Sequence, residues 1–185
     1  MALASPSTPN RNRGYTAVEL MFTVAIVGVV TALAVPNFRD FVQNNRAAEE
    51  ANALVGALSV ARSEAVTRGI PVSVCSSTDG ETCGGSDDWT TGWIVFTDGN
   101  APLGDVTDAV APAIPDTVLR VMPALRSGSE LAADADFVSY AANGFLGTAA
   151  GANFDLDIAE CTGEHNRAIA VNMQGRAAVT HVACD

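Results

Sequence analysis

The chain has 185 residues, 48% of them apolar, and a formal net charge of -11 from 21 carboxylates against 10 arginines, without any lysine. This length accommodates one soluble domain beside a long helix. The acidic charge repels nucleic acid and anionic lipid surfaces, so DNA binding would need a local basic patch. No recognisable phosphate-binding loop or arrangement of nucleophile, base and orienting group is present, which argues against an enzyme.

Residues 1–14 are rich in Ser, Pro, Asn and Arg and have no apolar core. This composition is typical of a processing leader whose positive charge stays in the cytoplasm. Its removal would take away Arg11 and Arg13 and change the formal charge from -11 to -13.

An uncharged run of 19 residues extends from Leu20 to Phe38. As a helix it would be about 28 Å long, close to the hydrocarbon thickness of a bilayer. Residues 15–38 are therefore predicted to be a transmembrane helix. Pro36 removes a backbone donor and is expected to kink or loosen it, helped by Gly28.

Glu19 stands at the entrance of this helix, where a carboxylate that faces lipid is costly and needs a partner. A cut between Gly14 and Tyr15 would supply one, because Tyr15 would gain an α-amino group that is largely cationic at neutral pH. The amine and the carboxylate are expected to pair between neighbouring chains. The cut would also leave Glu19 in the first helical turn, where the helix dipole favours negative charge.

These residues resemble the signature of the type IV pilins and the related pseudopilins of type II secretion. The matching features are a basic leader, a glycine before the cut, an aromatic residue after it, and a Glu and a Pro at set distances: Arg11, Arg13, Gly14, Tyr15, Glu19 and Pro36. Tyr15 replaces the usual Phe and keeps the ring. The resemblance implies cleavage after Gly14 and N-methylation of Tyr15. The alternatives are a simple single-pass anchor or an uncleaved signal peptide. A secretory signal would have small residues after the apolar run as its cut site, and Ala32 and Ala34 loosely fit that position.

From Arg39 to Arg68 the pattern predicts an amphipathic helix that ends at Gly69. Its apolar face recurs at spacings of three and four: Ala47, Ala51, Leu54, Leu58, Ala61 and Ala65. This face must be covered, and a sheet built from the following residues is the expected cover.

Residues 69–185 alternate short apolar runs with turn residues, as in a β-rich domain. The predicted strands are Ile70–Ser76, Gly92–Thr97, Thr117–Met122, Phe137–Tyr140, Phe154–Ala159, Ala168–Asn172 and Ala177–Val182. Met173–Arg176 is expected to join the last two as a tight hairpin. Ala101–Pro115 is expected to be a surface loop.

The layout also resembles the GspH/FimT branch of minor pilins and pseudopilins. The matching segments are Ala61–Ala65 with Arg68-Gly69, Val72–Cys75, Gly92–Phe96, and Gly175-Arg176 before a C-terminal Cys. The resemblance implies an α+β pilin fold, in which a long N-terminal helix packs against an antiparallel β-sheet domain held outside the cytoplasm.

Four cysteines form two separated groups, Cys75 with Cys83 and Cys161 with Cys184. In an extracytoplasmic domain an even count indicates disulfides, and local pairing is favoured among three possible connectivities. The alternative at the second pair is zinc held by Cys161, His165, His181 and Cys184.

Two further groups of residues could bind a ligand or have a purely structural role. Oxygen ligands of the kind that calcium takes are present at Asp98, Asn100, Asp105 and Asp108. The twelve-residue pattern of a calcium loop is missing, so a solvated acidic loop is favoured and no metal or cofactor is predicted. Trp89 and Trp93 are either an exposed binding patch or core residues, with Trp89 over the Cys75–Cys83 loop.

Some members of the GspH/FimT branch bind DNA through a basic C-terminal hairpin. Here that hairpin offers Arg176, with His181 in place of a second cation, so DNA is an unfavoured partner.

The sequence thus predicts a non-enzymatic minor pilin that helps to initiate or cap a type IV pilus, with roles in twitching, adhesion or DNA uptake. It would sit in the inner membrane with its β-domain in the periplasm and then join the pilus at the cell surface. The implied partners are other major and minor pilins, the prepilin peptidase and the assembly platform. The alternatives are a type II secretion pseudopilin and a membrane-tethered receptor for DNA or a surface ligand.

Overall fold

The computed structural model describes residues 14–99, 116–148 and 150–184, with the backbone alone for Pro36 and Asn37. Residues 1–13 and the predicted loop Ala101–Pro115 lie outside this part of the chain. The chain divides into two compact units that meet between Arg39 and Asp40. One helix, α1 (Ala17–Arg68), contributes residues to both units.

In the first unit, Thr16 caps the start of α1. Its side-chain oxygen accepts the backbone N–H of Glu19 at 3.2 Å, and its carbonyl accepts the N–H of Leu20 at 3.1 Å. A threonine in this position satisfies donors that a helix start otherwise leaves unpaired. From there α1 continues across Gly28 and Pro36 without a break. The local unwinding expected at Pro36 is therefore absent from this structure.

In the second unit, the predicted apolar face of α1 is the buried face. All six residues of that face are at most 2% exposed: Ala47, Ala51, Leu54, Leu58, Ala61 and Ala65. The helix ends as predicted, because Gly69 takes a left-handed conformation with φ 70° and donates its N–H to the carbonyl of Ala65 at 2.9 Å. Glycine adopts this conformation without a steric penalty from a side chain.

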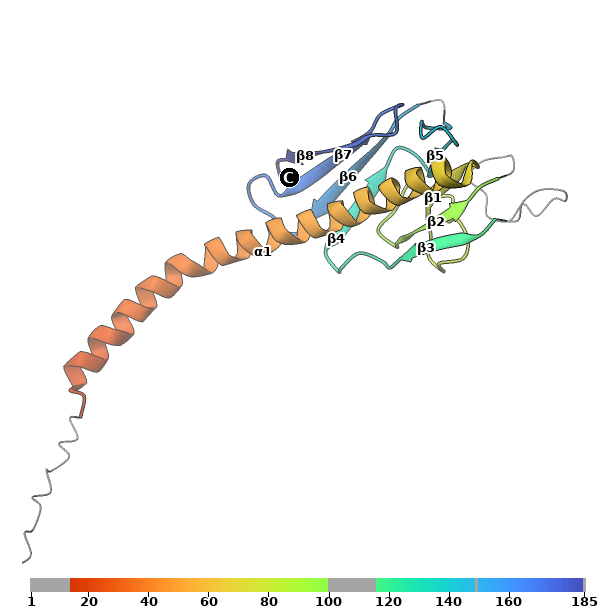
Figure 1. Ribbon diagram of the computed structural model, residues 1–185. Coiled ribbons are helices and arrows are strands. Elements are labelled where there is room, and N and C mark those ends of the chain that lie inside the picture. The colour runs from red at the N-terminus through yellow and green to blue at the C-terminus, as the bar shows by residue number, and fades with distance from the viewer. Residues whose placement is uncertain (1–13, 100–115, 149, 185) are drawn as a thin grey trace, which may run out of the picture. The chain divides into compact units, whose positions relative to one another are not determined.

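Within the described residues the strands form two antiparallel sheets of four strands each. The first sheet has the order β3-β2-β1-β5, from β1 (Val72–Ser76), β2 (Trp93–Thr97), β3 (Val118–Met122) and β5 (Phe137–Tyr140). The second has the order β4-β6-β7-β8, from β4 (Ser129–Ala133), β6 (Ala152–Ile158), β7 (Asn166–Val171) and β8 (Ala177–Val182). The part of α1 that follows Asp40 lies against both sheets (Figure 1).

The main core joins α1 to both sheets, and it contains both tryptophans. Trp89 meets the ring of Phe154 on β6 edge-on, with 4.9 Å between ring centroids. Burial of Trp89 and Trp93 excludes the exposed aromatic patch. The expected place of Trp89 over the Cys75–Cys83 loop is also wrong, because Cys75 belongs to a second apolar cluster with Ile94 and Phe96.

All seven predicted strands are present, with ends shifted by up to two residues. Strand β4 was not predicted. Its sequence, Ser-Glu-Leu-Ala-Ala, holds residues with weak β propensity, so no apolar run marks it. Pairing with β6 makes it a strand, and it alternates as a half-buried strand does, with Ser129 and Leu131 inward.

Candidate functional site

Glu19 lies in the first turn of α1 and is exposed, as are Gly14 and Tyr15 before the helix. Among the residues that the structure describes, its carboxylate has no hydrogen-bond or ion-pair partner in its own chain. The carboxylate is therefore free to pair with a group from another molecule. The Thr16-x-x-Glu19 spacing is a capping-box pattern, which in the sequence alone already indicates a helix start at this position.

The first unit exposes a continuous apolar surface. Every described side chain from Gly14 to Arg39 is exposed, and the large apolar ones are Tyr15, Val18, Leu20, Met21, Phe22, Val24, Ile26, Val27, Val29, Val30, Leu33, Val35 and Phe38. The helix is long and apolar enough to cross a membrane. The hydroxyls of Thr23 and Thr31 donate to backbone carbonyls of the preceding turn, so these two donors are paired within the helix.

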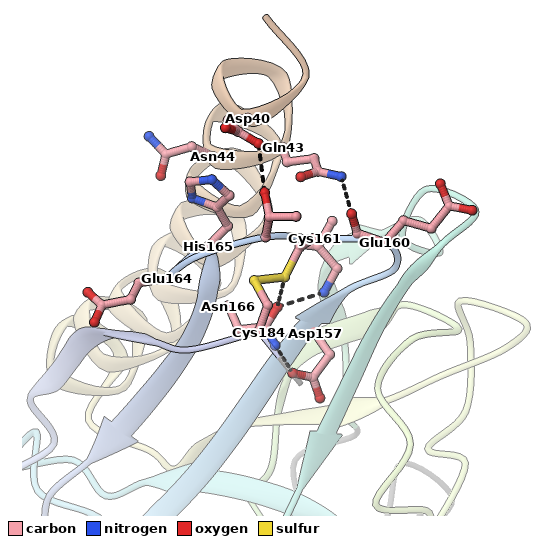
Figure 2. The surroundings of a disulfide bond; sticks show 12 residues. Asp40, Gln43, Asn44, Asp157, Glu160, Cys161, Glu164, His165, Asn166 and Cys184 are labelled. Atoms are coloured by element: carbon pink, nitrogen blue, oxygen red, sulfur yellow. Dashed lines mark hydrogen bonds between the residues drawn. A yellow bond between two sulfur atoms is a disulfide. The ribbon is translucent and has the colours of Figure 1, made fainter. Parts of the chain in front are cut away.

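Disulfides join Cys75 to Cys83 and Cys161 to Cys184, the local pairs favoured from the sequence. The second bond holds the loop after β6 against the chain end. Figure 2 shows this loop beside α1, where the Thr162 hydroxyl donates to the Asp40 carboxylate at 2.7 Å and the Gln43 amide donates to the Glu160 carbonyl at 2.9 Å. The loop is thus fixed to the first turns of α1 in the second unit.

Arg167 on β7 completes this attachment through a contact with α1 that no local sequence pattern marks. Its side chain is 3% exposed. One guanidinium nitrogen donates to the carbonyls of Glu164, His165 and Asn166 at 3.2, 2.7 and 2.9 Å, and the other donates to the Asn44 side chain of α1 at 2.5 Å. Burial lowers the pKa of Arg167 from its ordinary value. A buried guanidinium bonded to four oxygens is an internal brace.

Arg176 lies at the end of the hairpin turn, directly before β8, and its side chain is exposed. With Arg62 of α1 it lines a cavity of about 330 Å³. Tyr140, also in the lining, stays neutral because burial raises its pKa to about 12 against the opposing effect of Arg62. Arg62 was not among the predicted site residues, because no local pattern links it to a residue 114 positions away.

The zinc hypothesis at the second cysteine pair is wrong, because both sulfurs form the disulfide and thiolates are the zinc ligands. His181 faces the carbonyl of Glu164 at 3.3 Å instead. Of the calcium candidates, Asp98 is buried and accepts a hydrogen bond from Ser73, while Asn100, Asp105 and Asp108 lie outside the described residues. Residues 14–99, 116–148 and 150–184 contain no group of three or more His, Cys, Asp or Glu suited to a metal ion.

Comparison with known proteins gives short matches to pilins. The chain is 49% identical over 39 residues to the type IV major pilin protein PilA of Myxococcus xanthus, which is 21% of this chain and 18% of the relative. It is 37% identical over 73 residues to a fimbrial protein of Pseudomonas aeruginosa, which is 38% of this chain and 44% of the relative. The chain therefore matches less than half the length of these relatives.

The fold resembles a solved structure over most of its length. The crystal structure of the type IV minor pilin FimU of Pseudomonas aeruginosa aligns with a TM-score of 0.53 and 23% identity, over 77% of this chain and 92% of that one. A long N-terminal helix packed on antiparallel sheets is the pilin fold expected from the sequence, and this likeness confirms it. A family model described as Type II transport protein GspH matches residues 50–175. This range is more than half of the chain and takes in the buried face of α1 from Ala51 on, the first sheet and three strands of the second, and the chain therefore belongs to the GspH family.

Proposed function

We propose that this chain is a minor pilin, a structural subunit that helps to start or cap a type IV pilus. The observation that carries the proposal is the exposed apolar surface of α1 before a GspH-family domain. Nothing in the described part of the chain covers this surface. Exposed apolar patches of this extent mark membrane or protein contacts. A subunit that moves from a bilayer into a helical filament needs both contacts in turn.

In this proposal, assembly replaces lipid around α1 with the helices of neighbouring subunits. Helix association gains little from the hydrophobic effect inside a membrane, so packing and polar pairs decide it. Glu19 supplies the polar group, and its partner is the free α-amino group of a neighbouring subunit's first residue. Because an unpaired carboxylate in an apolar bundle is costly, this pair sets the register between helices.

The proposal includes the processing that creates the amine. A prepilin peptidase cuts between Gly14 and Tyr15, and Tyr15 is then N-methylated. The helix from Tyr15 to Phe38 anchors the chain in the inner membrane, the amphipathic stretch 39–68 leads into the β-rich domain 69–185 in the periplasm, and an assembly platform passes the subunit into the filament. Mass spectrometry of the mature chain should show a terminus at Tyr15. An intact Met1, or a terminus beyond Val35, contradicts the proposal.

The pairing of Glu19 is tested with Glu19→Gln and Glu19→Ala in the full chain, scored in membrane and sheared-filament fractions. Both variants should insert into the membrane as the wild type does, because the apolar run is unchanged. Incorporation into filaments should fall by about tenfold or more, the equivalent of losing roughly 1.4 kcal/mol or more of pairing energy. Thr31→Ala is the matched control in the same helix and should be incorporated normally, because the Thr31 hydroxyl bonds only its own backbone. Normal incorporation of Glu19→Ala refutes the register mechanism.

A second candidate function is a minor pseudopilin of type II secretion, and the description of the matching family favours it. In that system the filament drives exported proteins outward. Deletion of the gene separates the two functions. Loss of surface filaments with normal protein secretion supports the minor pilin, whereas loss of secretion with normal filaments supports the pseudopilin.

A further inference from the structure

The cavity that Arg62 and Arg176 line lies between α1, Tyr140 at the end of β5, and the β7–β8 turn. Arg62 donates its Nε–H to the carbonyl of Gly144 at 2.9 Å, so the turn after β5 is fixed to α1. Gly175 of the β7–β8 turn lies so close to the same carbonyl that a Cβ there would be 2.6 Å from its oxygen. The cavity is therefore enclosed by α1 and two turns that are in direct contact with one another.

Three side chains of this cavity have hydrogen-bond donors without a partner among the described residues. They are the terminal guanidinium nitrogens of Arg62, the whole guanidinium of Arg176 and the hydroxyl of Tyr140. Tyr140 is 1% exposed, and because burial raises its pKa to about 12, its hydroxyl keeps the proton that it can donate. Buried polar groups are normally hydrogen-bonded, so a buried donor that lines a cavity without an internal partner indicates a ligand from outside.

The cavity is basic in a strongly acidic chain. No Asp or Glu lines it, whereas the other arginines of α1 after Asp40, Arg46 and Arg68, are each paired with a glutamate four residues away. Planar guanidinium groups with free donors match the oxygens of a carboxylate. A single carboxylate is favoured over a nucleic-acid backbone, because the net charge of -11 repels a polyanion as a whole.

We propose that Arg62, Tyr140 and Arg176 form a binding site for a carboxylate group. The group belongs to an acidic side chain of a partner protein or to a free small carboxylate, and a cavity of about 330 Å³ can hold either. The two guanidinium groups supply the positive charge, and the Tyr140 hydroxyl donates a neutral hydrogen bond. The inference goes beyond the proposed function, because the site lies within the second unit and binding to it does not depend on filament assembly.

Binding of succinate to the full chain in detergent tests the site. Equilibrium dialysis with radiolabelled succinate at fixed ionic strength should show one saturable site per chain, with a Kd of about 1 mM or lower. Succinamide has the same length without the charges and should not compete. Phosphate and a short single-stranded oligonucleotide should each compete about tenfold less well than unlabelled succinate. Absence of saturable succinate binding overturns the proposal, and stronger competition by phosphate or the oligonucleotide overturns the choice of a carboxylate.

Two substitutions separate ligand binding from stability. Arg176→Gln removes a charge from an exposed side chain and should weaken succinate binding by about tenfold or more. Tyr140→Phe removes only the hydroxyl and should weaken binding by about fivefold. It should not lower Tm, because this hydroxyl has no hydrogen-bond partner within the described part of the chain. Arg120→Gln is the matched control, since Arg120 is exposed on β3 outside the cavity, and it should bind succinate as the wild type does.

Unchanged binding in Arg176→Gln, or an equal loss in Arg120→Gln, overturns the proposal. A Tyr140→Phe variant with a lower Tm and an unchanged affinity for succinate removes the hydroxyl from the site and gives it a structural role.

A photo-crosslinker distinguishes the two sources of the carboxylate. Ser63→p-benzoylphenylalanine places the crosslinker at an exposed position of the cavity lining, and cells that make this full chain are irradiated. A cross-linked protein whose yield falls when Arg176→Gln is added supports the site and assigns the carboxylate to a side chain of a partner. No such product, beside intact succinate binding, supports the site and assigns it to a free small carboxylate.

Discussion

Replacing Arg167 with methionine is expected to loosen the C-terminal loop from α1. The change removes the hydrogen bonds to the carbonyls of Glu164, His165 and Asn166 and to the side chain of Asn44. Each bond to a charged group contributes about 1.5–3 kcal/mol, but the methionine also avoids the cost of burying a cation, which is several kcal/mol. The expected net loss in the free energy of unfolding is about 3 kcal/mol.

Two further variants separate the contributions to this loss in the free energy of unfolding. Arg167→Lys keeps the charge and one donor group but cannot reach both the loop carbonyls and α1, so it should lose about half as much. Asn44→Ala removes the bond to α1 alone and should cost about 1–2 kcal/mol. In a double-mutant cycle, Asn44→Ala should add little to Arg167→Met, because both remove the same contact.

Thermal unfolding of the full chain in detergent measures these losses. Trp89 and Trp93 are the only tryptophans and both are buried, so their emission reports on the main core. A loss of about 3 kcal/mol corresponds to a fall in Tm of roughly 6–12 °C for a chain of this size. If Arg167→Met unfolds within about 2 °C of the wild type, or if the losses at Arg167 and Asn44 simply add, the guanidinium is not a brace between loop and helix.

Three other predictions concern single features of the second unit. The double variant Cys161→Ser with Cys184→Ser should lose about 3 kcal/mol in chemical denaturation, because the bond closes a loop of 23 positions, and a loss below 1 kcal/mol would contradict the entropic account. Hydrogen bonds from the Thr82 backbone and side chain hold the pKa of Asp79 well below its ordinary value of 3.8, so the stability it contributes is present above about pH 4 and is lost as the pH falls. Asp79→Asn should therefore flatten the dependence of Tm on pH below about pH 4, and an unchanged slope would count against this assignment. Gly175→Ala places a Cβ 2.9 Å from the ring of Tyr140 in a residue with φ 72°. It should lower Tm more than Gly85→Ala, because Gly85 has a similar φ of 58° but no atom within 4 Å of the added Cβ. Equal decreases in Tm would show that backbone strain alone matters and the steric clash does not.

Local sequence patterns were sufficient to predict a helix face or a turn that is formed by residues close together in the chain. The face from Ala47 to Ala65 was predicted because a helix that packs on a sheet repeats its apolar contacts every three or four residues. The turn at Gly175 was predicted because glycine follows Gln174 between two apolar runs, and its φ of 72° is one that glycine accepts readily. The strand β4 had no such pattern, since its alanines and glutamate become a strand only by pairing with β6.

The sequence by itself determined the long apolar helix, the position of Glu19 in its first turn, the end of the helix at Gly69 and seven of the described strands, because these depend on neighbours a few residues apart. Only the tertiary structure decided the division into two sheets, the brace between Arg167 and Asn44, 123 positions apart, and the meeting of Arg62 with Arg176. These contacts depend on strand order and on how the sheets lie against α1. Many pairings of the same strands would satisfy the same local pattern, and the packing of one common core selects among them.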